Sequence, residues 1–123
     1  MEMKLELVPV PVADVDAAID FYVNKVGFNL DHDHQVTDSL RFVQLTPKGS
    51  ACSIALGTGI TEMTPGSQKN LQMVVKDAAA AREMLLENGV EASEIQDMPW
   101  GIFTFFADPD DNTWSLQQIK RDN

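Results

Sequence analysis

The chain is poor in cysteine and in basic residues, and it has no long apolar run. Cys52 is the only cysteine among 123 residues, so no disulfide can form within the chain. Nine basic residues stand against nineteen acidic ones, and the net charge of −10 disfavours binding to nucleic acid and to anionic membranes. No apolar stretch approaches membrane-spanning length, and the N-terminus lacks the basic-then-apolar order of a signal peptide. These absences predict a cytoplasmic protein with no nucleic-acid partner and no membrane partner.

The composition that remains is that of a soluble globular domain. Hydrophobic residues make up 44% and charged residues 23% of the chain. A length of 123 residues is enough to bury one hydrophobic core. We therefore expect a single domain over residues 1–123.

One local plan occurs twice along the chain. Leu5–Val12 is apolar and strand-like, and Asp14 follows it as the N-cap of a helix with apolar residues at helical spacing. Leu71–Val75 is again apolar, and Asp77 follows it in the same way. The two caps lie 63 positions apart (77 − 14), and a glycine closes each helix. The sequence thus predicts a duplicated strand–helix unit.

Three further strands are expected after each helix, separated by turn residues. They are Phe28–Val36, Leu40–Thr46 and Ala51–Leu56 in the first half, and Val90–Gln96, Gly101–Ala107 and Thr113–Gln118 in the second. Each half reads as βαβββ, with a first module at 1–57, a connector at 58–68 and a second module at 69–123. One such helix covers only one face of its sheet, so the other face must meet something else. The predicted fold is α+β, with two βαβββ modules whose curved mixed sheets enclose a cleft.

Two motifs carry a family resemblance. The first runs from Val12 to Phe28 and reads Val-x-Asp-x-x-x-Ala-x-x-Phe-Tyr-x-x-x-x-Gly-Phe. The second is the acidic turn Asp108-Pro109-Asp110-Asp111-Asn112 before the last strand, in which Pro109 is suited to the second position of a tight turn. Together they resemble the vicinal-oxygen-chelate superfamily, which contains glyoxalase I, bleomycin-resistance proteins and extradiol dioxygenases. The resemblance covers nearly the whole chain and implies the two-module cleft.

In the metal-dependent members of that superfamily, the resemblance implies one metal ligand on each of four strands. The matching positions here are Leu7, Ala55, Asn70 (or its neighbours Leu71 and Gln72) and Ser115. None of these side chains is a competent ligand for a catalytic divalent metal. Glu6 lies beside Leu7, but strand alternation would turn it to the opposite face. We therefore predict no metal, no cofactor and no catalytic residue.

His32 and His34 are the only histidines, and they alternate with two aspartates in Asp31-His32-Asp33-His34. The period of a strand places both imidazoles on one face and both carboxylates on the other. A His-x-His pair binds zinc or copper only when a third ligand approaches, and no motif supplies one. A polar strand at the surface or at the mouth of the cleft is the favoured interpretation.

Strand alternation also selects the side chains that face the cleft. On the last strand, Trp114 and Leu116 are expected against the helix, with Thr113, Ser115 and Gln117 facing inward. Trp100 follows Pro99 in a loop, where it either caps a flat ligand or covers an edge or subunit contact. The predicted ligand-binding residues are Leu7, Phe42, Gln44, Ala55, Gln72, Trp100, Phe103, Phe105 and Ser115.

The favoured function is a metal-free small-molecule-binding protein that sequesters an antibiotic or metabolite, as the bleomycin-resistance branch does. The acidic balance suits a cationic ligand, and the loop residue Trp100 suits a flat aromatic one. Two alternatives remain: a glyoxalase- or dioxygenase-like metalloenzyme with unconventional ligands such as His32 and His34, and an interaction module with a vestigial cleft. The resemblance also implies a homodimer, the commonest symmetric oligomer.

Overall fold

The computed structural model describes residues 1–120 of the chain. Its elements follow the order β1 (Leu7–Pro9), α1 (Val15–Asp20), the π-helical turn η1 (Phe21–Val26), β2 (Asn29–Thr37), β3 (Leu40–Thr46), β4 (Ser53–Thr58), β5 (Leu71–Val74), α2 (Ala78–Glu87), β6 (Gln96–Met98), β7 (Gly101–Ala107) and β8 (Thr113–Ile119). No helix within residues 1–120 is long and apolar enough to cross a membrane.

Both predicted helix caps are confirmed. An Asp14 carboxylate oxygen accepts a hydrogen bond from the Ala17 N–H at 3.1 Å, and Asp77 accepts from the Ala80 N–H at 3.1 Å. Each bond satisfies one of the amides that the first turn of a helix leaves without an internal partner. The first helix continues as η1 and ends at Gly27, whose φ of 98° lies in the left-handed region that favours glycine.

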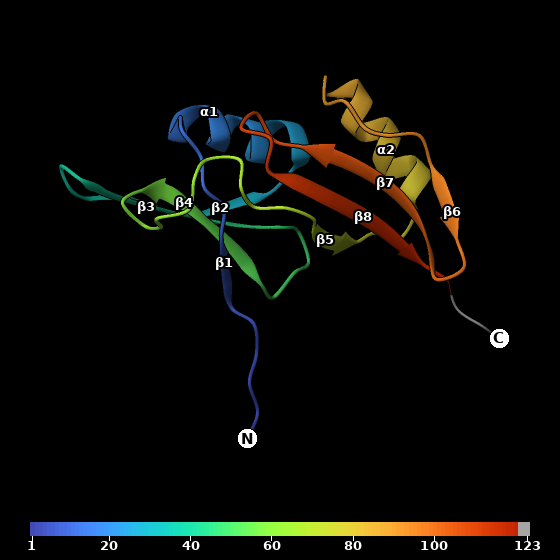
Figure 1. Cartoon of the computed structure of the whole chain (residues 1–123), viewed down its shortest axis with the longest axis horizontal. Helices are drawn as coiled ribbons and strands as arrows, with labels where there is room; N and C mark the ends of the chain where they lie inside the picture. Colours follow the sequence, from blue (N-terminus) through green and yellow to red (C-terminus); the bar gives the residue numbers. More distant parts are fainter. Residues whose placement is uncertain (121–123) are drawn as a thin grey trace.

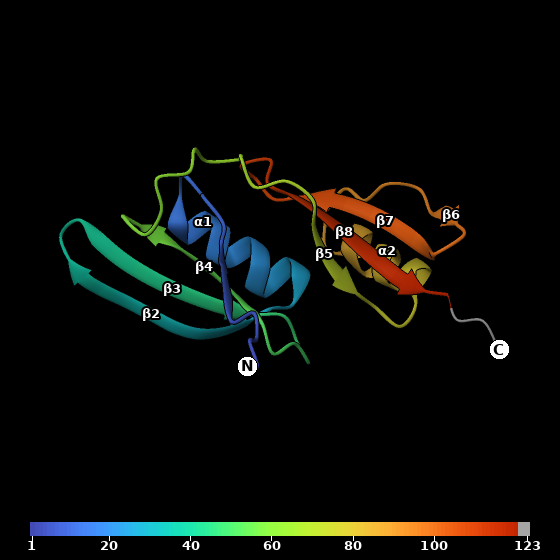
Figure 2. The ribbon, with the colours of Figure 1, turned by 60° about the horizontal axis from the view of Figure 1, so that its bottom comes forward.

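The two sheets have the same order of strands. The first sheet runs β1-β4-β3-β2 and the second runs β5-β8-β7-β6. In each sheet the first strand pairs parallel and the other neighbours pair antiparallel. Figures 1 and 2 show the sheets side by side, with α1 and α2 on the same side of the molecule. The predicted α+β fold of two βαβββ modules is confirmed.

Two strands are shorter than expected. Within the predicted segment Leu5–Val12 only Leu7–Pro9 forms a regular strand, although Glu6 and Val10 each make one further backbone hydrogen bond to β4. The predicted strand Val90–Gln96 is wrong for most of its length, since β6 begins only at Gln96. The Ser93 N–H still donates to the Phe105 carbonyl, and the Phe105 N–H donates to the Ser93 hydroxyl, so this segment runs along β7 without forming a regular strand.

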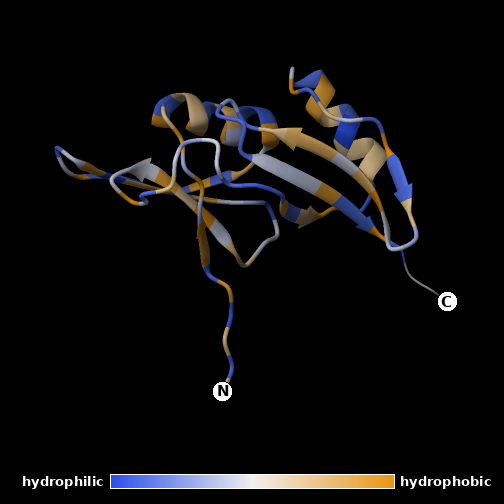
Figure 3. Cartoon of the chain, in the orientation of Figure 1, coloured by the Kyte–Doolittle hydropathy of each residue, from blue (hydrophilic) through white to orange (hydrophobic). Residues whose placement is uncertain are grey.

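One hydrophobic core extends across both modules. Trp114 of the second module packs edge-on against Tyr22 and Phe28 of the first, with ring centroids 5.9 and 5.7 Å apart. Figure 3 shows β7 as a mainly apolar strand next to this core. The buried cluster comprises Val10, Ala18, Phe21, Tyr22, Phe28, Val43, Leu45, Ile54, Leu56, Leu85, Val90, Phe106, Trp114 and Leu116. Burial of these side chains is the main force holding the modules together.

A buried polar network also connects the two sequence motifs; we call it the inter-module latch (Tyr22, Asp108, Asn112, Trp114). The Tyr22 hydroxyl donates to an Asp108 carboxylate oxygen at 2.7 Å and accepts from the Trp114 Nε1–H at 2.9 Å. Tyr22 belongs to the first motif and Asp108 to the acidic turn. The two motifs are therefore parts of one contact, made across 86 positions of the chain.

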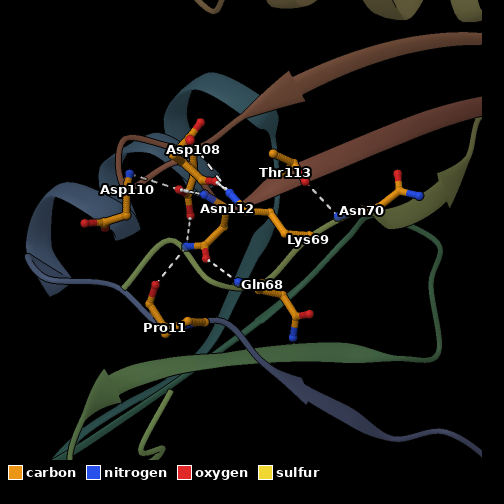
Figure 4. Close-up of polar contacts among 9 residues, drawn as sticks. Pro11, Gln68, Lys69, Asn70, Asp108, Asp110, Asn112 and Thr113 are labelled. Carbon is orange, nitrogen blue, oxygen red and sulfur yellow. Dashed lines mark hydrogen bonds and ion pairs between the residues drawn. The ribbon is translucent and has the colours of Figure 1, made fainter. Parts of the chain in front are cut away.

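Asn112 completes the latch, as Figure 4 shows. Its side-chain amide nitrogen donates to the Pro11 carbonyl and to Asp108, both at 2.8 Å, and its Oδ1 accepts from the Gln68 N–H at 3.1 Å. The side chain is fully buried. It thereby fixes the end of the first strand, the connector and the acidic turn to one another.

The latch predicts an unusual alkaline titration. Burial, reinforced by the charge of Asp108 and the hydrogen bond to it, raises the pKa of Tyr22 far above its usual value. A raised pKa stabilises the fold at pH values below the unfolded tyrosine pKa of about 10, and that contribution declines above it. Tyr22 is the only tyrosine, so absorbance at 295 nm reports this residue alone. We expect no phenolate signal before alkaline unfolding.

The variant Tyr22→Phe removes the hydroxyl and keeps the aromatic ring, so it measures the contribution of the hydroxyl alone. It leaves the Trp114 Nε1–H and Asp108 short of one partner each, so we expect a loss of about 1–3 kcal/mol at pH 7. The variant should lose less stability than the wild type between pH 10 and 12. Phenolate absorbance appearing at pH 10 in the folded wild type would contradict this account.

Candidate functional site

The candidate site consists of the faces of the two sheets that point away from the helices, here called the cleft faces. In the first sheet, Val43, Leu45, Ile54 and Leu56 belong to the helix-packed core, so their neighbours along each strand lie on the cleft face. The register pairs Phe42 with Gly57 and Gln44 with Ala55, and β1 adds Leu7 opposite Ser53. The register therefore places Leu7, Phe42, Gln44 and Ala55 on one face of the first sheet.

Hydroxyl and amide groups connect the strands of this face. Ser53 accepts from the Gln44 side-chain amide at 3.2 Å and shares a 2.6 Å hydrogen bond with the Thr46 hydroxyl. Thr46 in turn donates to the Asp31 carboxylate. His32 and His34 lie at the outer edge of the same face, with ring centroids 5.8 Å apart. The outer edge of this face thus carries one carboxylate, that of Asp31, and the two imidazoles.

The two aspartates of β2 occupy different environments, and one of them departs from the prediction. Asp33 lies on the face opposite the imidazoles, as expected, and binds Arg41 through two hydrogen bonds of 2.9 Å. These bonds hold the pKa of Asp33 below its ordinary value. Regular alternation predicts Asp31 on that face too, but a bulge between Leu30 and His32 breaks the alternation. The Asp31 carboxylate consequently reaches Thr46, a residue of the cleft face.

The cleft face of the second sheet is aromatic and uncharged. The register pairs Ser115 with Gln72 on one side and with Phe105 on the other. Phe103 and Phe105 lie parallel on β7, with ring centroids 6.0 Å apart and an interplanar angle of 5°. The register therefore places Gln72, Phe103, Phe105 and Ser115 on one face of the second sheet.

A chain of hydrogen bonds crosses this second face. The Ser115 hydroxyl donates to Gln72 Oε1 at 3.3 Å, and the Gln72 amide donates to Gln117 Oε1 at 2.5 Å. Gln117 then donates to the Trp100 carbonyl at 3.2 Å. The backbone of the Trp100 turn is fixed in this way, while its side chain stays exposed, with a relative accessibility of 62%. Alternation alone places Gln117 on this face without indicating that it anchors Trp100.

The two cleft faces differ in charge. The first includes Asp31, His32 and His34. The second, as far as residues 70–119 define it, presents no charged side chain. Its members by register are Gln72, Val74, Gln96, Met98, Gly101, Phe103, Phe105, Ala107, Thr113, Ser115, Gln117 and Ile119. A ligand that meets both faces therefore meets ionisable groups at one side and neutral amides and aromatic rings at the other.

The donor set does not fit a catalytic metal. Only Ser115 among Leu7, Ala55 and Ser115 has a polar side chain. Its neutral hydroxyl donates a hydrogen bond to Gln72. Asn70 lies at the start of β5 with its backbone N–H bonded to Thr113. Among residues 1–120, no group of three or more His, Cys, Asp or Glu side chains is arranged to hold a metal ion. We derive no chemistry through a metal.

Two hollows border the second sheet. One of about 890 Å³ lies at the end of β7, between Phe105 and the loop at 89–93. The other, of about 460 Å³, runs beside β5 between the modules and is lined mainly by apolar residues from η1, β5 and α2. The cleft face of the second sheet is open only in part in one copy of the chain, since Gln72 and Val74 are exposed and Phe105 is half-buried, whereas Phe103 and Ser115 are buried.

Proteins of known structure are similar to this chain in both sequence and fold. TnmS3, an antibiotic binding protein from Streptomyces sp. CB03234, is 37% identical with a TM-score of 0.88, over 97% of this chain and 98% of its own. A member of the glyoxalase/bleomycin resistance protein/dioxygenase superfamily from Sphaerobacter thermophilus is 30% identical with a TM-score of 0.82, over 94% of this chain and 97% of its own.

A curated protein of Bacillus subtilis (strain 168), the uncharacterized protein YetH, is 30% identical over 96% of this chain and 100% of YetH. The sequence profile of the Glyoxalase/Bleomycin resistance protein/Dioxygenase superfamily matches residues 4–116. The duplicated module, the paired motifs and these matches agree, and the chain belongs to the Glyoxalase/Bleomycin resistance protein/Dioxygenase superfamily.

Proposed function

We propose that this protein binds a small antibiotic-like or metabolite molecule on its cleft faces and sequesters it in the cytoplasm without transforming it. The observation that carries the proposal is the nature of the second cleft face, where parallel Phe103 and Phe105 rings lie beside a row of neutral hydrogen-bonding groups. Small-molecule sites are mostly apolar, with a few polar groups that fix orientation. The similarity to TnmS3, an antibiotic binding protein, supports the same function.

The preferred ligand has a flat aromatic part with carbonyl or hydroxyl groups at its edge. The two phenylalanine rings offer a stacking surface, while Gln72, Ser115 and Gln117 both donate and accept hydrogen bonds. The Asp31 carboxylate at the outer edge of the first face, together with the net charge of −10, would attract a positively charged ligand. Leu7, Phe42, Gln44, Ala55 and Trp100 are the remaining contacts that we propose.

A second copy of the chain closes the cleft in this proposal. The second sheet leaves part of its cleft face open within one copy, with Gln72 and Trp100 exposed. A bound molecule buries most of its surface, which a single open sheet does not provide. We therefore propose a homodimer in which the cleft lies between subunits.

Binding is tested by thermal unfolding and tryptophan fluorescence with three groups of compounds: cationic glycopeptides, fused-ring aromatic antibiotics and aliphatic metabolites. We expect aromatic compounds to raise Tm and to quench exposed Trp100. Phe105→Ala should weaken binding about 30-fold, the effect of losing a central aromatic contact. Leu86→Ala, which removes an exposed apolar side chain from the outer helix, is the matched control and should leave the affinity unchanged.

Two results would overturn the proposal. One is the absence of any thermal shift or quenching across all three groups of compounds. The other is stoichiometric nickel, zinc, iron or manganese in protein purified without a histidine tag, together with turnover that His32→Ala or His34→Ala abolishes. The second result would favour the metalloenzyme alternative.

A further inference from the structure

The smaller of the two hollows beside the second sheet reaches the helix side of that sheet; we call it the inter-module hollow. Its walls are residues 26–28 at the end of η1, residues 47–50 of the β3–β4 turn, residues 72–75 of β5 and one side of α2. Figure 1 shows the β3–β4 turn next to β5. Leu85 and Leu116 of the hydrophobic core line the hollow, whereas Phe103 and Phe105 do not. The hollow therefore adjoins the second cleft face only at the edge formed by β5.

The lining of the inter-module hollow is mainly apolar. Phe28 of the first module and Met73 of the second both line it, and Val74 and Met84 keep 62% and 37% of their surface exposed. The volume of about 460 Å³ lies within the range of small-molecule sites, about 300–1,000 Å³. An apolar ligand that displaces water from these side chains gains free energy, and methionine side chains adapt to its shape. The hollow thus fits the apolar part of a small molecule.

The charge in the inter-module hollow is of one sign. Lys48, in the β3–β4 turn, is the only charged residue among the described residues that line it. Acidic residues outnumber basic ones nineteen to nine in the chain, yet none of the lining residues is acidic. Salt screens exposed charges over about 8 Å at physiological ionic strength, so the nearest ammonium counts for more than distant carboxylates. The hollow therefore favours an anion, whereas the Asp31 edge of the first cleft face favours a cation.

Lys48 is also the polar side chain of the hollow that remains without a partner among residues 1–120. The Ser50 hydroxyl donates to the Cys52 carbonyl at 3.0 Å, and the Gln72 amide donates to Gln117. Lys48 belongs to none of the ion pairs of the described residues. Asp31 lines a separate hollow beside the same turn, where its carboxylate accepts from Thr46. The Lys48 ammonium can consequently pair with the charged end of a ligand.

We propose that the inter-module hollow is a second ligand site, which binds an amphipathic monoanion such as a medium-chain carboxylate. The apolar chain of the ligand lies against Phe28, Met73 and Met84, and its carboxylate lies beside the Lys48 ammonium. Binding is noncovalent. The site is separate from the cleft of the proposed function and does not depend on it, because it needs neither the aromatic cleft face nor a second copy of the chain.

A ¹H–¹⁵N NMR titration with hexanoate, octanoate and decanoate both locates and measures this binding. We expect saturable shifts at the amides of Lys48, Met73 and Met84, with smaller changes at Phe103 and Phe105. Each added methylene should tighten binding about 3-fold, somewhat less than its full burial would give. The neutral analogue 1-octanol should bind about 5-fold more weakly than octanoate, because it lacks the ion pair with Lys48.

Two pairs of variants test the two parts of the site. Lys48→Gln should weaken octanoate about 5-fold and leave 1-octanol unchanged, whereas Lys120→Gln makes the same charge change outside the hollow and leaves both unchanged. Met84→Glu adds a carboxylate to the hollow and should weaken decanoate about 10-fold. Leu86→Glu makes that change on the same helix outside the hollow and should leave the affinity within about 2-fold. Positions 84 and 86 are exposed, so the fold should persist, which the same spectra report.

Four results would overturn the proposal. The first is the absence of saturable shifts at the hollow with decanoate. The second is equal binding of octanoate and 1-octanol to the wild type, which would leave Lys48 without a role. The third is equal weakening by Met84→Glu and Leu86→Glu, which would indicate nonspecific adsorption. The fourth is a dimer that dissociates in sedimentation velocity as decanoate binds, which would mean that a second copy covers the hollow.

The same titrations keep this inference distinct from the proposed function. Phe105→Ala should weaken aromatic ligands and leave decanoate unaffected, since Phe105 does not line the hollow. Decanoate binding without any aromatic ligand would refute the cleft and leave the hollow in place, and the converse result would refute the hollow alone. Equal loss of both kinds of ligand in Phe105→Ala would mean one shared site and would overturn the second.

Discussion

Asp108→Ala should lower the free energy of unfolding by about 4 kcal/mol, the largest effect that we expect from a single side chain. The buried carboxylate accepts hydrogen bonds from the Tyr22 hydroxyl, the Asn112 side chain and the backbone N–H groups of Asp110 and Asn112. Alanine removes the acceptor from all four donors at once. A buried donor that loses its partner costs about 1–3 kcal/mol, and partial hydration of the turn keeps the total below the simple sum.

Urea unfolding monitored by near-ultraviolet circular dichroism measures this loss, because Trp114 and Tyr22 lie in the affected core. Asp111→Asn is the control within the same turn. Asp111 is exposed and has a φ of 74°, a conformation that asparagine adopts readily, so the change should stay within about 0.5 kcal/mol. A loss below 1 kcal/mol for Asp108→Ala would show that water replaces the carboxylate and that the latch is dispensable.

Gly57→Ala should cost roughly 3 kcal/mol or more. A Cβ at position 57 would lie 1.9 Å from the Arg41 carbonyl oxygen and 2.9 Å from its carbon, so the β3–β4 ladder would have to shift. The backbone φ of 149° adds strain for any residue with a side chain. Differential scanning calorimetry should show Tm lower by roughly 10 °C.

Gly49→Ala separates the backbone strain from the clash. Gly49 also has a positive φ, of 83°, but among the described residues no neighbouring atom lies within 4 Å of the place that a Cβ would occupy. We expect a cost of about 1 kcal/mol, that of the left-handed conformation alone. Equal losses at positions 49 and 57 would contradict the steric argument.

Local signals account for the parts of the fold that the sequence predicts correctly. The caps Asp14 and Asp77 bind amides three residues further on, so their roles are visible in a short window. The β8 strand alternates large apolar and polar residues, which determines the facing of Trp114 and Ser115 without knowledge of the pairing.

Other features depend on contacts that no local window contains. The Tyr22 hydroxyl binds Asp108 across 86 positions, and either residue alone reads as part of a helix or a turn. The bulge at Asp31 adds one residue to β2, which a regular alternation does not include. The segment at 90–95 has the composition of a strand, yet it forms only isolated contacts with β7.

The latch also makes the two modules unequal. The position that corresponds to Tyr22 in the second module is Leu85 (22 + 63), and both side chains are fully buried. One module thus carries the phenol and the other carries the carboxylate that binds it. Neither half alone contains both partners of this hydrogen bond, so the two modules, although built on one plan, are complementary and not interchangeable.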